Sequence, residues 1–258
     1  IINNALRISS TGGITNILPF MPYLRGDKKS QSGEPIPAKV MAKMTEASGA
    51  NRIITVFPHF PQIHGFYDDA TMFDVLDPRV LFADWLLDNY DSKDLVIVPT
   101  DANSTAAVEK LATDLHAPHA ATTKRRDAPG SVKETRITFD GSLENKVIVI
   151  YDDMIDTGGS LIKCANYAKK AGAKEVLACI AHPILSCDAK ENLAKNNIRL
   201  VTTDSILIPE KEKYPNITVL SLGYLIAESI NCITSGNPIH QHLYNFEEFR
   251  KVKKARGL

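Results

Sequence analysis

The sequence predicts an α/β protein whose parallel β-sheets are flanked by helices and divided between two domains. Short apolar, β-branched segments alternate with helix-length amphipathic segments along most of the 258 residues. Most of the short segments are apolar without interruption, which is typical of strands that are covered on both faces. Two predicted helices end near a glycine that leads into the next strand, at Gly49 and Gly172. Parallel strands joined by helical crossovers account for all three observations.

The predicted strands are apolar runs bounded by Gly, Pro, Asn or Asp, namely Ile14–Pro19, Arg52–Phe57, Leu95–Pro99, Lys146–Tyr151, Glu175–Ala181, Ile198–Thr203 and Ile217–Leu222. The predicted helices have helical spacing of apolar residues, namely Ile36–Ser48, Ser104–Leu115, Ser160–Ala171 and Asp188–Asn196. A turn-rich stretch near Asp68–Pro78 divides these elements, so we expect one domain over residues 1–75 and another over residues 76–258. The charged segment from Tyr244 to Leu258 is interpreted as a solvated tail.

Composition excludes several classes of protein. Thirty basic residues balance thirty acidic ones, so no bulk charge favours nucleic acid or an anionic membrane. No apolar run approaches the roughly 18 residues that cross a bilayer. The cysteines lie singly, without metal-ligand spacing, which predicts reduced packing residues in a cytoplasmic protein. Because the chain starts at Ile1 and has no secretory signal, we expect a processed or incomplete N-terminus.

The segment VIVIYDDMIDTGGS, from Val147 to Ser160, is the most specific motif in the chain. An apolar strand leads into an acidic pair and a glycine-rich turn that starts a helix. Ligands of open α/β sheets bind at the carboxyl ends of strands, where backbone N–H groups at a helix start hold anions. The order predicts a site for a ribose and its 5-phosphate, formed by Asp152, Asp153, Asp156, Thr157, Gly158, Gly159 and Ser160. The alternative is a helix cap followed by a plain turn, and the ordered pattern favours the binding site.

This motif resembles the phosphoribosyl-diphosphate loop of the type I phosphoribosyltransferase fold, and its surroundings resemble the ribose-phosphate diphosphokinase family. The resemblance runs from about Asn4 to Leu243, and DDMIDTGGSLIK, AGAKEV and AHPILS carry it most closely. It implies two phosphoribosyltransferase-like domains, of which the N-terminal one is incomplete.

The N-terminal part is similar to the ATP side of that family. PFMPYLRGDKK is similar to the family's PYFGYARQDRK, which implies that Arg25 contacts the triphosphate, with Asp27 and Lys28 nearby. FPHFPQIHGFYD is similar to DLHAGQIQGFFD, which places His59 on a histidine that helps to hold Mg²⁺ at the ATP phosphates. Phe57 replaces the family's aspartate. Without the resemblance, the basic loop is a solvated turn and His59 is a structural histidine.

Two further segments follow the family pattern in part. VPTDANS lies where the family has SPDVGG; Asp101 is retained as a ligand for Mg²⁺ or a ribose hydroxyl, whereas Asn103 and Ser104 replace glycines that approach pyrophosphate. The KRR triplet matches the base of a mobile loop, which implies that Lys124 and Arg126 stabilise the transition state. A basic surface turn is the alternative, and the polar residues after the triplet are typical of a lid.

The resemblance implies Mg²⁺-dependent transfer of the pyrophosphoryl group of ATP to the anomeric hydroxyl of ribose 5-phosphate, giving phosphoribosyl diphosphate and AMP. It also implies a homo-oligomer built from dimers, as large as a hexamer. Two alternatives stay open. One is a non-catalytic regulatory or assembly homologue, favoured by Phe57 and the altered Asn103–Ser104 pair. The other is a phosphoribosyltransferase that consumes phosphoribosyl diphosphate, which shares the central loop and leaves the Arg25 and His59 segments unexplained.

Overall fold

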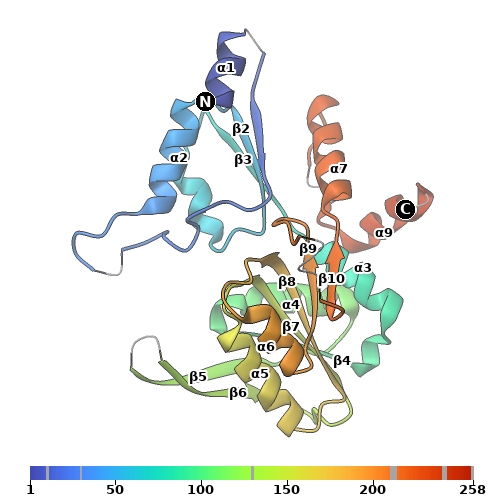
Figure 1. Ribbon diagram of the computed structural model, residues 1–258. Helices are drawn as coiled ribbons and strands as arrows, with labels where there is room; N and C mark the ends of the chain where they lie inside the picture. The colour runs from blue at the N-terminus through green and yellow to red at the C-terminus, as the bar shows by residue number, and fades with distance from the viewer. Residues whose placement is uncertain (10–11, 30, 129–130, 210–213, 240–242, 257–258) are drawn as a thin grey trace. The chain divides into compact units, whose positions relative to one another are not determined.

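The computed structural model describes residues 1–9, 12–29, 31–128, 131–209, 214–239 and 243–256, and for residues 124–128 and 131–134 it describes backbone alone. The chain forms two compact units, Ile1–Asp77 and Pro78–Leu258 (Figure 1). Each unit contains a parallel sheet flanked by helices, which confirms the predicted fold class. Among the described residues, no helix combines the length and the apolar character needed to cross a membrane.

Unit 1 is built on a three-stranded parallel sheet in the order β1-β2-β3. Its elements are α1 (Ile2–Ile8), β1 (Thr15–Leu18), α2 (Pro37–Ala47), β2 (Arg52–Val56), the 3₁₀ helix η1 (Pro61–Phe66) and β3 (Met72–Leu76). Helix α2 buries Ala38 and Ala42 against Ile53 of β2, and Ile63 of η1 joins the same core. Two of its strands match predicted ones closely, because both are apolar runs with clear breaks at each end.

Strand β3 was not predicted, because its residues fall in the stretch read as turn-rich. Met72–Leu76 pairs in parallel with β2, and Met72 lies opposite Arg52. The charged residue Asp74 interrupts the apolar run from Met72 to Leu76, so the sequence of this segment does not show the continuous apolar pattern of a buried strand. In the structure, the Arg52 guanidinium on β2 forms an ion pair with the Asp74 carboxylate, so this charge is neutralised on the sheet.

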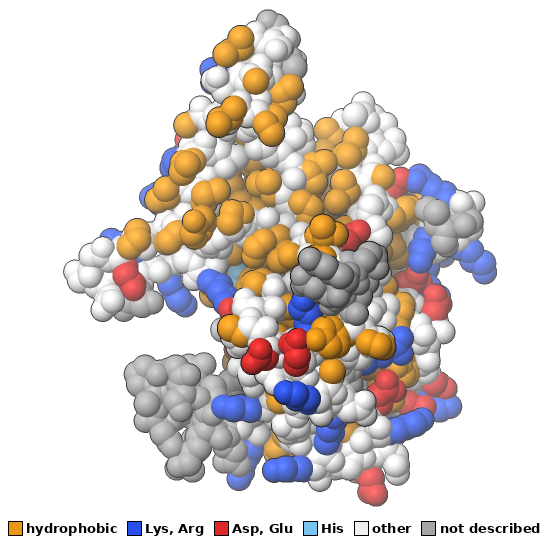
Figure 2. Space-filling view, in the orientation of Figure 1, with side chains coloured by type: hydrophobic (Ala, Val, Ile, Leu, Met, Phe, Trp, Pro, Cys, Tyr) orange, Lys and Arg blue, Asp and Glu red, His pale blue; other side chains and the backbone are white. Residues whose placement is uncertain are grey.

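Helices α1 and α2 carry large apolar side chains that are not covered within unit 1. Figure 2 shows hydrophobic side chains gathered over these two helices. Ile2 and Leu6 on α1 and Val40 and Met44 on α2 are all at least 41% exposed. The spacing of four residues within each pair places both members on one side of their helix.

Unit 2 is built on a five-stranded parallel sheet in the order β10-β9-β8-β7-β4. Its strands are β4 (Leu95–Pro99), β7 (Val147–Ile155), β8 (Glu175–Pro183), β9 (Arg199–Thr203) and β10 (Ile217–Leu220), and β5 (Ala121–Ala128) and β6 (Ser131–Thr138) form a separate antiparallel ribbon. Its helices are α3 (Arg79–Asn89), η2 (Ser92–Asp94), η3 (Ala102–Ser104), α4 (Thr105–Leu115), α5 (Gly159–Lys170), α6 (Ala189–Lys195), α7 (Gly223–Thr234) and α9 (Phe246–Ala255).

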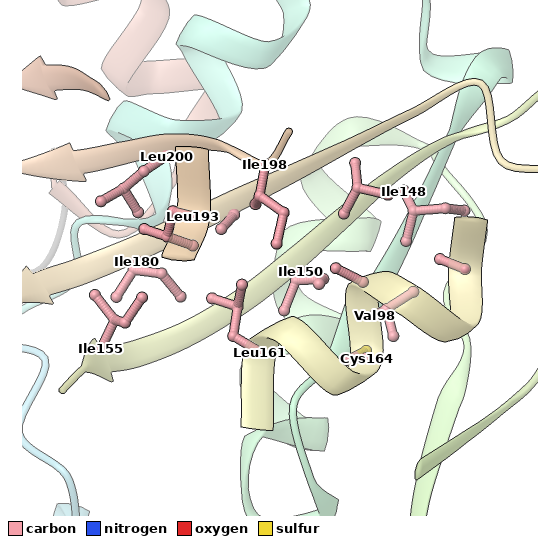
Figure 3. Packing of buried hydrophobic residues seen from close by; sticks show 14 of the residues in the cluster. Val98, Ile148, Ile150, Ile155, Leu161, Cys164, Ile180, Leu193, Ile198 and Leu200 are labelled. Atoms are coloured by element: carbon pink, nitrogen blue, oxygen red, sulfur yellow. The ribbon is translucent and has the colours of Figure 1, made fainter. Parts of the chain in front are cut away.

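Helices cover both faces of the large sheet, so its strands are apolar throughout. Figure 3 shows Leu161 and Cys164 of α5 packed near Ile150 of β7, with Leu193 of α6 in the same cluster. Successive strand residues point to opposite faces. The next residue, Tyr151, accordingly meets Phe82 of α3 on the other side, with 5.8 Å between ring centroids.

The C-terminal segment is not a solvated tail, as its charge suggested, but ends in helix α9. Phe246 and Phe249 are buried, and Asn245 caps the helix through a bond that the Glu248 N–H donates to its side chain. Asp84 of α3 accepts from Arg250 Nε at 2.7 Å and from Lys253 Nζ at 2.6 Å. The charges that suggested a tail therefore face a buried carboxylate on a helix far away in the sequence.

The segment read as a polar lid forms the ribbon of β5 and β6. Lys124 on β5 lies opposite Thr135 on β6, and Arg126 lies opposite Val132, with shifts of register around Arg126. Ile137 on β6 is buried in the core cluster that includes α5. The ribbon is thus anchored to unit 2 at its base.

Candidate functional site

The ends of β4 and β7 lie side by side in unit 2. The two strands pair in parallel, and Pro99 at the end of β4 lies opposite Tyr151 of β7. The Asp101 loop and the acidic pair are therefore neighbours, although the sequence separates them by α4 and the ribbon. This is the sheet edge at which open α/β folds bind ligands.

The acidic pair belongs to β7 itself. We expected the strand to end at Tyr151, but it continues to Ile155 alongside β8. Asp152 is on the face of Ile150, and its side chain interacts with that of the next residue, Asp153. Asp153 is 8% exposed. Asp153 is thus more deeply buried than Asp152, which is half-buried.

The Asp152 carboxylate accepts bonds from three donors among the described residues of unit 2. Thr100 Oγ1 donates to its Oδ2, and Ser104 Oγ donates to its Oδ1 at 2.8 Å. The Asp153 N–H donates to Oδ1 at 3.0 Å. Burial, followed by repulsion from the Asp153 carboxylate, raises the pKa of Asp152 from 3.8 to about 7, and the two hydroxyl donors oppose this rise.

The glycine-rich turn leads into α5 as expected. Gly158 has φ +77°, a left-handed conformation that favours glycine, and it occupies the position before the helix. No side chain of the described residues caps α5, and Thr157, Gly159 and Ser160 are exposed around its first turn. Asp156 is half-buried beside them. Open N–H groups, small hydroxyls and the positive end of a helix dipole can bind a phosphate here.

Asp101 lies in the loop after β4. Its Oδ1 accepts from the Asn103 N–H at 3.0 Å, which starts the single turn of η3. Asn103, which stands where the family pattern has a glycine, is exposed. The loop therefore keeps a carboxylate at the sheet edge without the glycine pair.

Two of the candidate ATP residues of unit 1, Lys28 and His59, contact Phe60, which the sequence analysis did not single out. Lys28 Nζ lies 5.1 Å from the centre of the Phe60 ring, and the His59 ring meets its edge at 4.5 Å between centroids. The two loops that carry them follow β1 and β2, so both are at the carboxyl edge of the small sheet.

The loop after β1 is held in a defined shape. The Gly26 N–H donates to the Tyr23 carbonyl at 2.9 Å, and a Cβ on Gly26 would lie 2.8 Å from Pro37. Arg25 is exposed, whereas Asp27 Oδ1 is buried without a hydrogen-bond partner among the described residues. A buried, unpartnered carboxylate oxygen suits a ligand that brings its own donor or cation.

The predicted transition-state residues lie on the ribbon. The backbone of Lys124 and Arg126 belongs to β5, and their side chains lie outside the part of the chain that is described. Both residues thus belong to the strand that follows α4.

The donors fit a hard cation that keeps part of its water shell. Over the described ranges, no three His, Cys, Asp or Glu side chains gather as a metal cage. Mg²⁺ is commonly held by one or two carboxylates together with substrate phosphates and water. Asp101 and the acidic pair, at one sheet edge, match that kind of site.

Sequence reasoning missed Thr100, and it treated Ser104 only as a lost glycine. Both hydroxyls contact Asp152 from a neighbouring strand end, and this contact depends on β4 pairing with β7. The available signal was the presence of two hydroxyl residues flanking Asp101 after a buried strand.

Two protein-family models match the chain. A phosphoribosyl transferase domain matches residues 81–212, and the N-terminal domain of ribose phosphate pyrophosphokinase matches residues 1–49. These ranges lie in unit 2 and unit 1, respectively.

Similar proteins include the ribose-phosphate pyrophosphokinase of Bacillus caldolyticus, 38% identical over 89% of this chain and 72% of that protein. Ribose-phosphate pyrophosphokinase 1 of Listeria monocytogenes is 37% identical over 89% of this chain and 71% of its own length. The crystal structure of phosphoribosylpyrophosphate synthetase from Mycobacterium smegmatis superposes with a TM-score of 0.83 at 33% identity, covering 92% of this chain and 76% of that one.

Proposed function

The chain belongs to the ribose-phosphate pyrophosphokinase family, and we propose that it makes phosphoribosyl diphosphate from ATP and ribose 5-phosphate. The anomeric hydroxyl of the sugar attacks the β-phosphorus of ATP, the bond from that phosphorus to the α-phosphate oxygen breaks, and AMP leaves. The main support for this proposal is the sheet edge of unit 2. There, the glycine-rich turn before α5, which suits a phosphate, lies next to the Asp152 carboxylate, which accepts a hydrogen bond from the Ser104 hydroxyl. Transfers of this kind depend on positioning and charge neutralisation.

Unit 2 supplies the ribose 5-phosphate site in this proposal. The first turn of α5, with Thr157, Gly158, Gly159 and Ser160, holds the 5-phosphate, because its open N–H groups and exposed hydroxyls suit an anion. The side chains of Asp152 and Asp153 accept from ribose hydroxyls, and Asp156 lines the turn between them and the phosphate.

Unit 1 supplies contacts to ATP. Arg25 contacts the triphosphate, and Lys28 adds a second cation in the same loop. Asp27 and His59 complete this set, and the contacts of Lys28 and His59 with Phe60 support it, because they bring residues of two loops to one aromatic ring.

Mg²⁺ is the metal that the donors suit. In unit 2, Asp101 would contact Mg²⁺, and in unit 1, His59 would contact Mg²⁺ at the ATP phosphates. When bound to phosphate oxygens, Mg²⁺ neutralises the charge that develops during transfer. Lys124 and Arg126 add fixed positive charge for the same transition state. We place the reaction in the cytoplasm, where the reduced cysteines predicted from the sequence would persist.

We also propose a homo-oligomer built from dimers, up to a hexamer. The exposed apolar side chains on α1 and α2 support association, because such patches are covered in most stable proteins. Light scattering on the eluting protein measures its mass directly; a monomer at micromolar concentration would contradict the proposal.

The function is tested by product identity. Protein mixed with Mg²⁺, ATP and ribose 5-phosphate should release AMP in step with phosphoribosyl diphosphate, as followed by ³¹P NMR. Release of ADP would indicate ordinary phosphoryl transfer and contradict the proposal. Absence of AMP with intact ribose 5-phosphate binding would favour a non-catalytic homologue. Consumption of added phosphoribosyl diphosphate with a nucleobase would favour a phosphoribosyltransferase.

A further inference from the structure

Two hydroxyl groups flank Asp101 and converge on the carboxylate of Asp152. Thr100 is 5% exposed and Ser104 is 9% exposed, so both hydroxyls are buried at the sheet edge. Thr100 Oγ1 donates to Asp152 Oδ2, and Ser104 Oγ donates to Oδ1 at 2.8 Å. The carboxylate is therefore held at both oxygens from one loop.

The backbone of this loop explains how both hydroxyls reach the same side chain. Thr100 directly follows Pro99, which lies opposite Tyr151, so it comes level with Asp152. The single turn of η3, begun by the bond from the Asn103 N–H to Asp101, then reverses the chain. Ser104 returns to the sheet edge at the start of α4 and meets Asp152 from its other side.

These bonds leave Asp152 with limited capacity for a ligand. A carboxylate has about four acceptor positions. The Asp153 N–H shares Oδ1 with Ser104, at 3.0 Å and 2.8 Å. Oδ2 accepts from Thr100 alone among the described residues. It is thus the oxygen that can accept a bond from a further donor.

The hydroxyl pair also differs from the family pattern. When SPDVGG is aligned on Asp101, proline stands at the position of Thr100 and glycine at that of Ser104. Neither proline nor glycine has a side-chain donor. In this chain, Thr100 and Ser104 therefore supply two side-chain donors to Asp152 where a proline and a glycine would supply none.

We propose that Thr100 and Ser104 are positioning residues that fix the Asp152 carboxylate so that Oδ2 receives a ribose hydroxyl of ribose 5-phosphate. This rests on the function proposed above. The two residues do not contact the reacting atoms; they set where one acceptor of the sugar site stands. Their effect is therefore on ribose 5-phosphate and not on ATP.

The test compares variants that remove each hydroxyl with variants that keep it. Thr100→Val and Ser104→Ala should each weaken ribose 5-phosphate binding about tenfold, as expected for a hydrogen bond to a charged group. Calorimetric titration with ribose 5-phosphate alone and KM for ribose 5-phosphate both report this loss, while KM for ATP stays unchanged. Thr100→Ser and Ser104→Thr retain the hydroxyl and should restore binding, which a purely volume-based effect would not do.

A double-mutant cycle identifies the group through which the hydroxyls act. In an Asp152→Asn background, Thr100→Val and Ser104→Ala should add little further loss, because the carboxylate they hold is gone. Full additivity with Asp152→Asn would overturn the proposal. Equal losses for ribose 5-phosphate and ATP, or unchanged binding in both hydroxyl-deleted variants, would overturn it as well.

Failure of this inference is distinguishable from failure of the proposed function. If the wild-type protein binds ribose 5-phosphate without releasing AMP, the proposed function is contradicted. The titrations of the variants with ribose 5-phosphate would still test whether Thr100 and Ser104 position Asp152. If AMP is released and the hydroxyl-deleted variants bind normally, the function stands and the pair has no positioning role. Wild-type protein that does not bind ribose 5-phosphate would overturn both.

Discussion

Asp152 is a partly buried acid whose protonation changes between weakly acidic and neutral pH. Its pKa is raised to about 7 by burial, and next by the neighbouring Asp153 charge. Such a group is ready to exchange its proton for a bound donor or cation, which is common where proteins bind charged ligands. Its elevated pKa also makes the stability of the protein depend on pH.

Asp152→Asn should change this dependence in a defined direction. Between about pH 4 and pH 7 the folded chain retains a proton that the unfolded chain releases, so the free energy of unfolding falls as pH rises. The variant lacks this titration. Its free energy of unfolding relative to wild type should therefore increase from pH 4 to pH 7 and then level off, as measured by urea unfolding. A constant difference across that range would contradict the assignment.

Alanine variants of Gly158 and Gly159, the two glycines of the phosphate turn, should differ in their free energy of unfolding. Gly158→Ala places a Cβ on a residue at φ +77° and should lower the free energy of unfolding by about 1–2 kcal/mol. Gly159→Ala is the matched control, because its Cβ would meet only Thr157 Oγ1, at 4.0 Å. It should unfold like wild type and yet bind ribose 5-phosphate more weakly. Equal stability of the two variants would contradict the conformational argument.

At the scale of elements, the sequence predicted the helices and strands whose apolar residues follow a clear pattern. The strand Leu95–Pro99 has the predicted bounds, and α2, α4 and α5 agree to within a residue or two at each end. Helix α3 was missed because the consecutive apolar residues Val80, Leu81, Phe82 and Ala83 are all buried, together with the polar Arg79 and Asp84, so apolar and polar positions do not alternate with a helical period. Tertiary contacts decide such segments, and they are not visible in local sequence.

Helix α9 is a second segment that is decided by tertiary contacts, in this case ion pairs with Asp84 of α3, and the contribution of these ion pairs to stability can be tested. Asp84→Ala removes the carboxylate, 8% exposed, that binds Arg250 and Lys253, and should cost about 1–3 kcal/mol of stability. Asp88→Ala is the control: Asp88 is 59% exposed and pairs, within the described part of the chain, with Arg250, so its loss should stay below about 1 kcal/mol. Chemical unfolding compares the two. A larger loss for Asp88→Ala would contradict the docking of α9 through Asp84.

The ribbon of β5 and β6 carries the cations proposed for the transition state. Lys124→Ala should lower turnover by on the order of a hundredfold, with ribose 5-phosphate affinity nearly unchanged, since the charge is needed mainly as transfer proceeds. Lys110→Ala, at an exposed position on α4, is the control and should behave like wild type. Steady-state AMP release and calorimetric titration separate the two quantities. A collapse of ribose 5-phosphate affinity in Lys124→Ala would contradict this role.

At the scale of the whole molecule, the two units have separate cores. Residues such as Ile53 and Ile63 form one, and Ile148, Ile150 and Leu161 contribute to the other. The sequence predicted two α/β layers because each contains its own strand–helix alternation. It could not predict which strand ends adjoin, because the order β10-β9-β8-β7-β4 depends on packing that is distant in sequence.

Separate cores lead us to expect separate unfolding steps, because proteins with two domains often depart from a single cooperative transition. The only tryptophan, Trp85, lies in α3 of unit 2 and stacks with Arg199 at 4.9 Å. Its fluorescence should therefore report unit 2 alone. Ribose 5-phosphate at 100 times its Kd should stabilise that transition by about 2.7 kcal/mol. An equal shift of every calorimetric component would contradict a sugar site confined to unit 2.

The pairing of β4 with β7 has a consequence for how the protein refolds. Strand β7 meets β8 across a single helix, but it meets β4 only after α4 and the whole ribbon have been looped out. Closing the longer loop costs more chain entropy, and distant pairings slow folding. We therefore expect the edge strand to dock late. Until it does, a refolding chain possesses the phosphate turn but not the hydroxyls that orient Asp152, so affinity for the sugar develops after most of the sheet has formed.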